Sequence, residues 1–134
     1  MEWNGTLPVS RHPEGLTGFE SLHAKDILFF RIEKGELQAH TKDEMFHLNG
    51  GEKIQRLLDT LWASNYHFVR SDRGDIPDIG KIRKFNRAWF RAYFDPEPNE
   101  NSKFIYIAKG RYDKFVELTM QYNSYIRDNP TSRT

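Results

Sequence analysis

The chain has 134 residues, of which 37% are hydrophobic and 29% charged, with a formal net charge of +1 and no cysteine. This length fits one domain with a hydrophobic core, and the lack of cysteine excludes disulfides and thiolate metal sites. No apolar run reaches membrane-spanning length and the first residues lack a secretory-signal pattern, so we expect a cytoplasmic protein with no membrane partner.

The charge is distributed unevenly along the chain. Residues 1–65 carry 7 Lys+Arg and 10 Asp+Glu, whereas residues 66–134 carry 13 and 9. The basic second half indicates an anionic partner.

Residues 1–18 are rich in Gly, Pro and polar residues. They predict an N-terminal arm whose short extended piece at 7–9 adds an edge strand to a domain at 19–128. Three apolar segments separated by polar turns then predict an antiparallel meander. These segments are 26–32, 37–41 and 45–48.

A helix is predicted over 52–64. Ile54, Leu57, Leu58 and Leu61 recur at i, i+3, i+4 and i+7 and form one apolar stripe. Asn65 suits the left-handed conformation that closes a helix.

The central stretch 68–82 consists of a short strand, a charged turn and a return to spaced isoleucines. Burying the turn unpaired would cost several kcal/mol, so we expect it to face water as a recognition loop. Arg73 lies at its apex and is a candidate for a bidentate contact to guanine or for a phosphate contact. Arg70 is expected to pair locally with Asp72 or Asp75.

Catalytic and metal motifs are weak. Asp72, Asp75 and Asp78 recur every three residues and could surround a hard cation, but EF-hand spacing and its closing Glu are missing. The five histidines show no ligand spacing, and no nucleophile–base set or phosphate-binding Gly loop is present. We expect no metal, no cofactor and no enzymatic activity.

Residues 81–94 combine cations with aromatic rings and contain no acid. A break near Asn86 and Arg87 predicts two strands. The rings could stack on bases of a single strand, or they could form the core while the cation stems lie along the surface. The cations are Lys81, Arg83, Lys84, Arg87 and Arg91, and the rings are those of Phe85, Trp89, Phe90, Tyr93 and Phe94.

The last part of the chain predicts a polar connection over 95–102, a strand over 104–108 and a second helix over 112–127. Lys109, Gly110 and Arg111 precede that helix, where backbone N–H groups and two cations favour an anion. An ordinary polar turn is the alternative. Residues 129–134 predict a flexible tail.

Several of these segments resemble the LytTR DNA-binding domain. Phe68, Arg70, Arg73, Ile76 and Ile82 match its central signature without a gap. Residues 26–30 resemble the family's opening strand, 52–64 its first helix, and 111–114 its closing element. The resemblance covers about residues 20–120.

The resemblance implies an α+β fold, predominantly β, with stacked antiparallel sheets, two helices and loops that enter successive major grooves of DNA. It implies base contacts by Arg73, by Arg111 and by the first hairpin turn through Lys34 and Glu36. Neighbouring phosphate contacts are expected from four cations. These are Arg70, Lys81, Lys109 and Lys114.

The chain departs from the family at Asp75, Pro77 and Asp78, where Tyr, Val and Asn are usual, and at the acidic Glu36. Pro77 requires an edge strand or a break. The receiver domain of most family members has no room here, which predicts a stand-alone domain.

Two functions follow from the resemblance. The first is a bacterial transcription regulator that binds double-stranded DNA sequence-specifically, on paired sites, as a homodimer or as side-by-side monomers. The second is a protein-interaction module that docks another regulator and has lost DNA binding.

Overall fold

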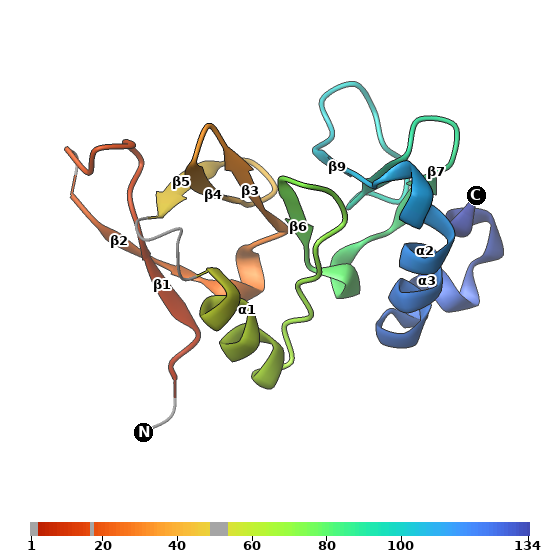
Figure 1. Cartoon of the computed structure of the whole chain (residues 1–134), viewed down its shortest axis with the longest axis horizontal. Coiled ribbons are helices and arrows are strands. Elements are labelled where there is room, and N and C mark those ends of the chain that lie inside the picture. The colour runs from red at the N-terminus through yellow and green to blue at the C-terminus, as the bar shows by residue number, and fades with distance from the viewer. Residues whose placement is uncertain (1–2, 17, 49–53) are drawn as a thin grey trace.

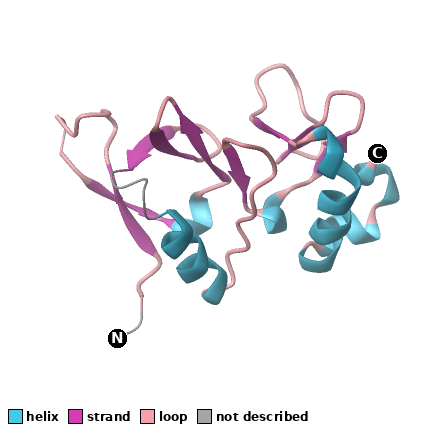
Figure 2. Ribbon diagram, viewed as in Figure 1, coloured by secondary structure: helices cyan, strands magenta, loops and turns pink. Residues whose placement is uncertain are grey.

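The computed structural model describes residues 3–16, 18–48 and 54–134. Within them, antiparallel sheets follow one another along the long axis of the molecule (Figure 1). One sheet pairs β1 (Thr6–Val9) with β2 (Glu20–His23), a central sheet has the order β5-β4-β3-β6, and a third has the order β7-β8-β9. Helices lie beside the sheets (Figure 2).

The predicted meander is confirmed as β3 (Phe29–Glu33), β4 (Glu36–His40) and β5 (Met45–Leu48). Lys34 and Gly35 connect β3 to β4 with φ values of 53° and 79°. Two residues with positive φ are typical of the tight hairpin turn that matches strand twist. The fourth strand, β6 (Asp75–Pro77), pairs with β3 at the edge of the sheet, as predicted from Pro77.

The N-terminal segment is part of the first core instead of a separate arm. β1 pairs with β2, a strand that the sequence did not predict, and Leu7 and Val9 of β1 are buried. Ser10 and His47 exchange two backbone hydrogen bonds of 2.9 and 2.7 Å, which join this segment to β5. The expected boundary at residue 18 therefore lies within the β1–β2 connection.

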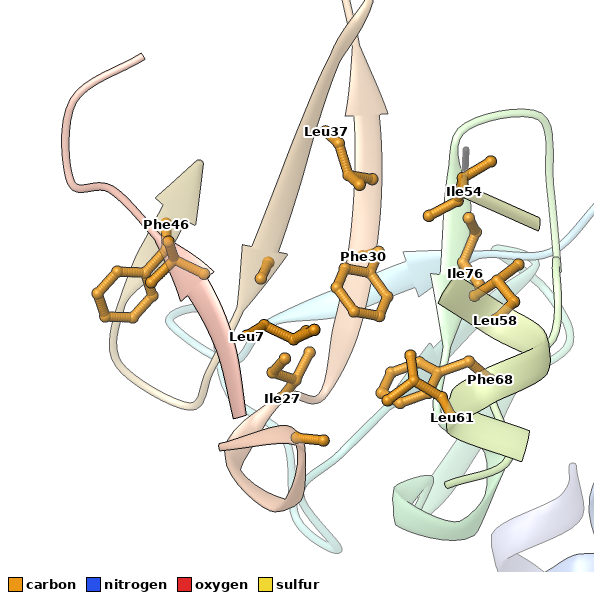
Figure 3. Close-up of a cluster of buried hydrophobic side chains, with 13 residues drawn as sticks. Leu7, Ile27, Phe30, Leu37, Phe46, Ile54, Leu58, Leu61, Phe68 and Ile76 are labelled. Carbon is orange, nitrogen blue, oxygen red and sulfur yellow. The ribbon is translucent and has the colours of Figure 1, made fainter. Parts of the chain in front are cut away.

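The described part of the first predicted helix is α1 (Ile54–Ala63), and residues 52 and 53 lie outside the described residues. Ile54, Leu58 and Leu61 are buried, and Figure 3 shows Leu58 and Leu61 facing Phe68 and Ile76. Asn65 has a φ of 68°, as predicted for the residue that closes the helix.

A second core lies under the third sheet. Its strands are β7 (Lys84–Asn86), β8 (Arg91–Tyr93) and β9 (Phe104–Tyr106). Phe85, Ala92 and Ile105 are the central residues of these strands and are fully buried. They pack with side chains from α2 (Tyr112–Tyr122) and α3 (Ser124–Asp128). No helix of the described segments is long and apolar enough to cross a membrane.

The single second helix predicted over 112–127 is wrong, because the chain leaves the helical conformation at Asn123 (φ −143°, ψ 94°). The buried Asn123 amide donates hydrogen bonds of 2.7 Å to the carbonyls of Ile79 and Ile82. Its side-chain oxygen accepts from the N–H of Ile126 and caps α3. These bonds offset the break in the helix.

The C-terminal segment contains a short helix. Residues 129–134, predicted to be flexible, include the 3-10 helix η5 (Pro130–Arg133), in which Ser132 is buried. Residues 129–131 and 134 are exposed, and the flexibility of the tail stays a prediction.

His40 lies where the two cores meet. Its ring stacks on Phe29 with 4.4 Å between centroids, and its two nitrogens lie 3.1 Å from Gln38 Oε1 and 3.3 Å from Lys103 Nζ. An acceptor Nδ1 facing the Lys103 ammonium and a donor Nε2 facing the Gln38 oxygen fit the neutral ring. Burial, followed by the charges of Lys103 and Arg31, lowers the pKa of His40 to about 3.

Candidate nucleic-acid interface

Three exposed loops emerge on one side of the molecule. β3 and β6 are antiparallel, and Ile32 N–H donates to the Gly74 carbonyl at 2.8 Å. The β3–β4 turn and the central loop (residues 70–74) therefore leave the same end of the sheet. The short 3-10 helix η4 (Lys109–Arg111), between β9 and α2, lies on the same upper side in Figure 1.

A buried carboxylate fixes the positions of these loops relative to one another. Asp75, only 4% exposed, accepts from Arg31 Nε at 2.7 Å, from Arg31 Nη2 at 3.2 Å and from the Tyr106 N–H at 2.7 Å. Arg31 also donates to the Phe104 carbonyl at 3.1 Å. We call this set of contacts, which joins β3, β6 and β9, the Asp75 cross-brace.

The prediction that the whole charged turn faces water is therefore wrong at Asp75. The cost of burying an unpaired charge is real, but Arg31 supplies the pair from a position 44 residues earlier. Asp78 is buried too. It accepts from Gly80 N–H at 3.0 Å at the start of the 3-10 helix η3 (Ile79–Lys81) and lies 3.4 Å from Lys81 Nζ.

Ser71 links the central loop to β9 and η4. Its hydroxyl donates to the Tyr106 carbonyl at 2.7 Å, and its own carbonyl accepts from Ala108 N–H at 2.8 Å. Ser71 is 1% exposed, so both bonds are shielded from water. Sequence reasoning missed Ser71, since a lone serine in a polar turn carries no distinguishing signal.

Three arginines meet where these loops join. Arg111 Nη2 donates to the Arg70 carbonyl at 3.3 Å, and Arg70 Nη1 lies 3.4 Å from the Arg73 carbonyl. Arg70 thus bonds to a backbone carbonyl, and the expected pair with Asp72 or Asp75 is not among the ion pairs of the described residues, since Asp75 binds Arg31. The Arg73 and Arg111 side chains are exposed. We call Arg70, Arg73 and Arg111 the arginine cluster.

Gly74 allows the central loop to approach β3 closely. A Cβ atom at this position would lie 2.7 Å from the Ile32 carbonyl oxygen, a contact that side chains do not tolerate. A glycine directly after Arg73 therefore lets the loop end against β3, where β6 begins.

The first hairpin turn carries Lys34, which is exposed at its tip. Glu36 begins β4 and its carboxylate lies 3.7 Å from His47 Nδ1 on the neighbouring β5. The Glu36 side chain is 52% exposed, so this residue is accessible at the same end of the sheet.

The four cations expected to contact phosphate divide into two groups. Arg70, Lys109 and Lys114 lie in or beside the arginine cluster, and the two lysines are exposed. Lys81 instead donates to the Ala24 carbonyl at 3.1 Å and the Ile27 carbonyl at 2.6 Å and pairs with Asp78. Burial lowers its pKa. Its ammonium is occupied inside the fold, so the phosphate contact expected of Lys81 is wrong.

The aspartates of the central stretch have separate partners and form no common site. Asp75 binds Arg31, while Asp78 binds Lys81. Across the part of the chain that the structure describes, no three His, Asp or Glu side chains gather in a way that could hold a metal ion.

The basic and aromatic stretch forms two strands with a break after Asn86, as predicted. Its rings are divided: Phe85 is fully buried, whereas Trp89 in the β7–β8 turn is 65% exposed. The core interpretation therefore applies to Phe85, whereas the Trp89 ring lies at the surface.

Comparison with known proteins supports the fold. The chain is similar to a solved LytTr DNA-binding domain from Bacillus cereus, with a TM-score of 0.62, 9% sequence identity, and coverage of 87% of this chain and 97% of that domain. No protein-family model and no curated protein matches the chain. The likeness confirms the predicted α+β, predominantly β, LytTR-like fold class.

Proposed function

We propose that this chain is a transcription regulator that binds double-stranded DNA sequence-specifically through loops placed in the major groove. The arginine cluster carries the proposal. Arg73 and Arg111 are 38 positions apart in the sequence, yet they project from loops that Ser71 and the Asp75 cross-brace hold side by side. Rigidly placed arginines suit bidentate contacts to guanine edges.

Roles follow from position. Arg73 and Arg111 contact bases, and Lys34 and Glu36 reach a neighbouring groove from the first hairpin turn. Arg70, Lys109 and Lys114 contact phosphates, which orient the protein without reading sequence. The similar Bacillus cereus domain is described as DNA-binding, which is consistent with these roles. We further propose that two copies bind paired sites.

The protein-interaction alternative rests on the near-neutral net charge of +1 and on carboxylates near the proposed DNA face. Two of them, Asp75 and Asp78, are 4% exposed and are paired with Arg31 and Lys81. Their charge is neutralised inside the fold, so they do not repel phosphate at the surface. This observation favours DNA over a protein partner.

Selection from random duplex DNA at two salt concentrations tests the proposal. We expect enrichment of a paired motif and an affinity that falls steeply as salt rises, because bound cations release counterions from phosphates. No enrichment at low salt would contradict the proposal.

A matched pair of variants tests the role of Arg73. Arg73→Ala should cost about 1–3 kcal/mol on the selected site and relax its base preference. Arg56→Ala removes the same charge from an exposed position on α1, on the lower side of Figure 1, and should leave affinity and preference nearly unchanged. Equal losses in both variants would mean that only net charge matters.

A further inference from the structure

The outer face of the third sheet carries aromatic rings and cations. Phe85, Ala92 and Ile105 point inward, so their neighbours in each strand point outward. The register places Arg91 opposite Tyr106 and Tyr93 opposite Phe104. The outward residues of β8 and β9 thus form a continuous surface.

Arg91 organises this surface. Its guanidinium carbon lies 4.1 Å from the ring centre of Phe104, 5.4 Å from that of Trp89 and 5.6 Å from that of Tyr106. Its Nε is buried and meets no hydrogen-bond acceptor among the described residues, and its guanidinium faces the three rings. We call Trp89, Arg91, Phe104 and Tyr106 the stacking face.

The stacking face is held rigidly but remains open. The Trp89 N–H donates to Asn86 Oδ1 at 3.1 Å, and the Phe90 carbonyl accepts from Ile107 N–H at 2.8 Å. Phe90 has a φ of 51°, an unusual value for a bulky residue that the surrounding contacts must maintain. Despite this order, Trp89 is 65% exposed and Tyr106 44%.

We propose that the stacking face binds unpaired nucleobases, so that the chain takes up single-stranded or locally opened DNA in addition to duplex. Aromatic rings with a neighbouring arginine stack on any base through its π face. This function goes beyond duplex reading and does not depend on it.

Continuity with the arginine cluster favours nucleic acid over a protein as the occupant. The Tyr106 carbonyl is bonded to Ser71, next to Arg70. Lys109 Nζ lies 6.0 Å from the ring of Phe90, which follows Trp89 in the chain and packs against the second core. The backbone of β9 therefore links the stacking face to the arginine cluster, which supplies the cations that the phosphates of a bound nucleic-acid strand require.

The surrounding charges indicate where the sugar–phosphate backbone of a bound nucleic-acid strand lies. Two residues of the stacking face, Arg91 and Phe104, also line a groove of about 670 Å³, whose other walls include Glu97 and Glu100. These carboxylates repel phosphates, whereas Lys109 and Arg111 attract them. The sugar–phosphate backbone accordingly runs from the stacking face toward η4.

The test uses a fluorescent oligothymidylate of about 12 nucleotides, within the range that single-strand-binding domains cover. We expect the intact chain to bind it and Trp89→Ala to bind at least about fivefold more weakly, the effect of losing one stacked base. Phe19→Ala is the matched control, because Phe19 is 64% exposed in the β1–β2 connection, and it should bind as the intact chain does.

A second measurement needs no variant and covers the case in which Trp89→Ala fails to fold. An abasic oligonucleotide of equal length keeps every phosphate and lacks every base, so it should bind the intact chain at least as weakly as oligothymidylate binds Trp89→Ala. Equal binding of the abasic and thymidylate strands would overturn the proposal, as would no binding of either.

Two further results distinguish nucleobase binding by the stacking face from duplex binding and from dimerisation. Arg73→Ala should lose duplex preference while its affinity for oligothymidylate still exceeds that for the abasic strand, which would tie the two surfaces to different ligands. The other result is that the chain does not bind oligothymidylate but forms dimers in sedimentation velocity, and that Trp89→Ala abolishes these dimers. The stacking face would then bind a second copy of the chain, and the nucleobase proposal would be refuted.

Discussion

Replacing Asp75 by alanine should strongly destabilise this fold. The substitution removes three hydrogen bonds, leaves the Arg31 guanidinium without its carboxylate and leaves the Tyr106 N–H without an acceptor. Arg31 keeps 26% side-chain exposure and the Asp75 side chain only 6%. Removing one partner of a buried pair costs about 3–5 kcal/mol, and because water still reaches Arg31 we expect a loss near the lower end, about 3 kcal/mol.

Urea unfolding followed by circular dichroism measures this loss. With a typical dependence on urea for a small domain, about 3 kcal/mol corresponds to a midpoint lower by about 2 M. Asp72→Ala is the matched control, since it removes the same charge from a half-exposed side chain three residues earlier and should change stability by less than about 0.5 kcal/mol.

A double variant distinguishes loss of a pair from loss of packing. Arg31→Met together with Asp75→Ala leaves no buried charge, so stability should partly recover, with about 1–3 kcal/mol still missing because the Tyr106 N–H stays unpaired. Equal midpoints for Asp75→Ala and Asp72→Ala, or a double variant as unstable as the two single losses added together, would refute the cross-brace.

Three further predictions concern glycine, asparagine and histidine. Gly74→Ala should destabilise the fold by about 1–3 kcal/mol, because its methyl group would press on the Ile32 carbonyl; Gly110→Ala, with open space around it, should be tolerated in the same urea experiment. Asn123→Ala should cost about 1–3 kcal/mol by leaving two buried carbonyls unpaired, while the exposed Asn101→Ala should unfold at the parental midpoint. The pKa of His40 is about 3 in the folded chain and about 6.5 when unfolded, so its contribution is complete above pH 6.5 and is lost as the pH falls toward 3. Between pH 7 and 5 it should account for about 1–2 kcal/mol, and His40→Gln should flatten that part of the pH profile; an unchanged slope would contradict the assignment.

Local signals predicted the parts of the fold that depend on neighbouring residues. The apolar spacing of Ile54, Leu58 and Leu61 predicted α1, and Pro77 predicted an edge strand because proline lacks a donor for a second neighbour. The pairing of β1 with β2 was missed, since β2 is short and mostly polar. The break at Asn123 was missed because its partners, Ile79 and Ile82, lie more than 40 positions away.

In the candidate site too, features set by neighbouring residues could be predicted and features set by distant residues could not. The charge and turn position of Arg73 and Arg111 predicted that both side chains are exposed, and in the structure both are exposed. Their proximity could not be predicted, because it depends on bonds from Ser71 to residues of the segment 106–108. Lys81 illustrates the converse: its charge predicts exposure, but carbonyls more than 50 residues earlier in the chain surround its ammonium.

The Asp75 cross-brace should also determine when the surface that we propose to bind DNA forms during folding. The β3–β4–β5 meander closes short loops and can form early, whereas the bonds from Arg31 to Asp75 and to Phe104 close loops of 44 and 73 residues. Contacts of such long sequence separation form slowly, since their loop entropy must be overcome before any contact stabilises them. Refolding protein should therefore regain much of its β-sheet signal before the loops of the arginine cluster come together, and the proposed binding of duplex DNA should appear with the slowest kinetic phase.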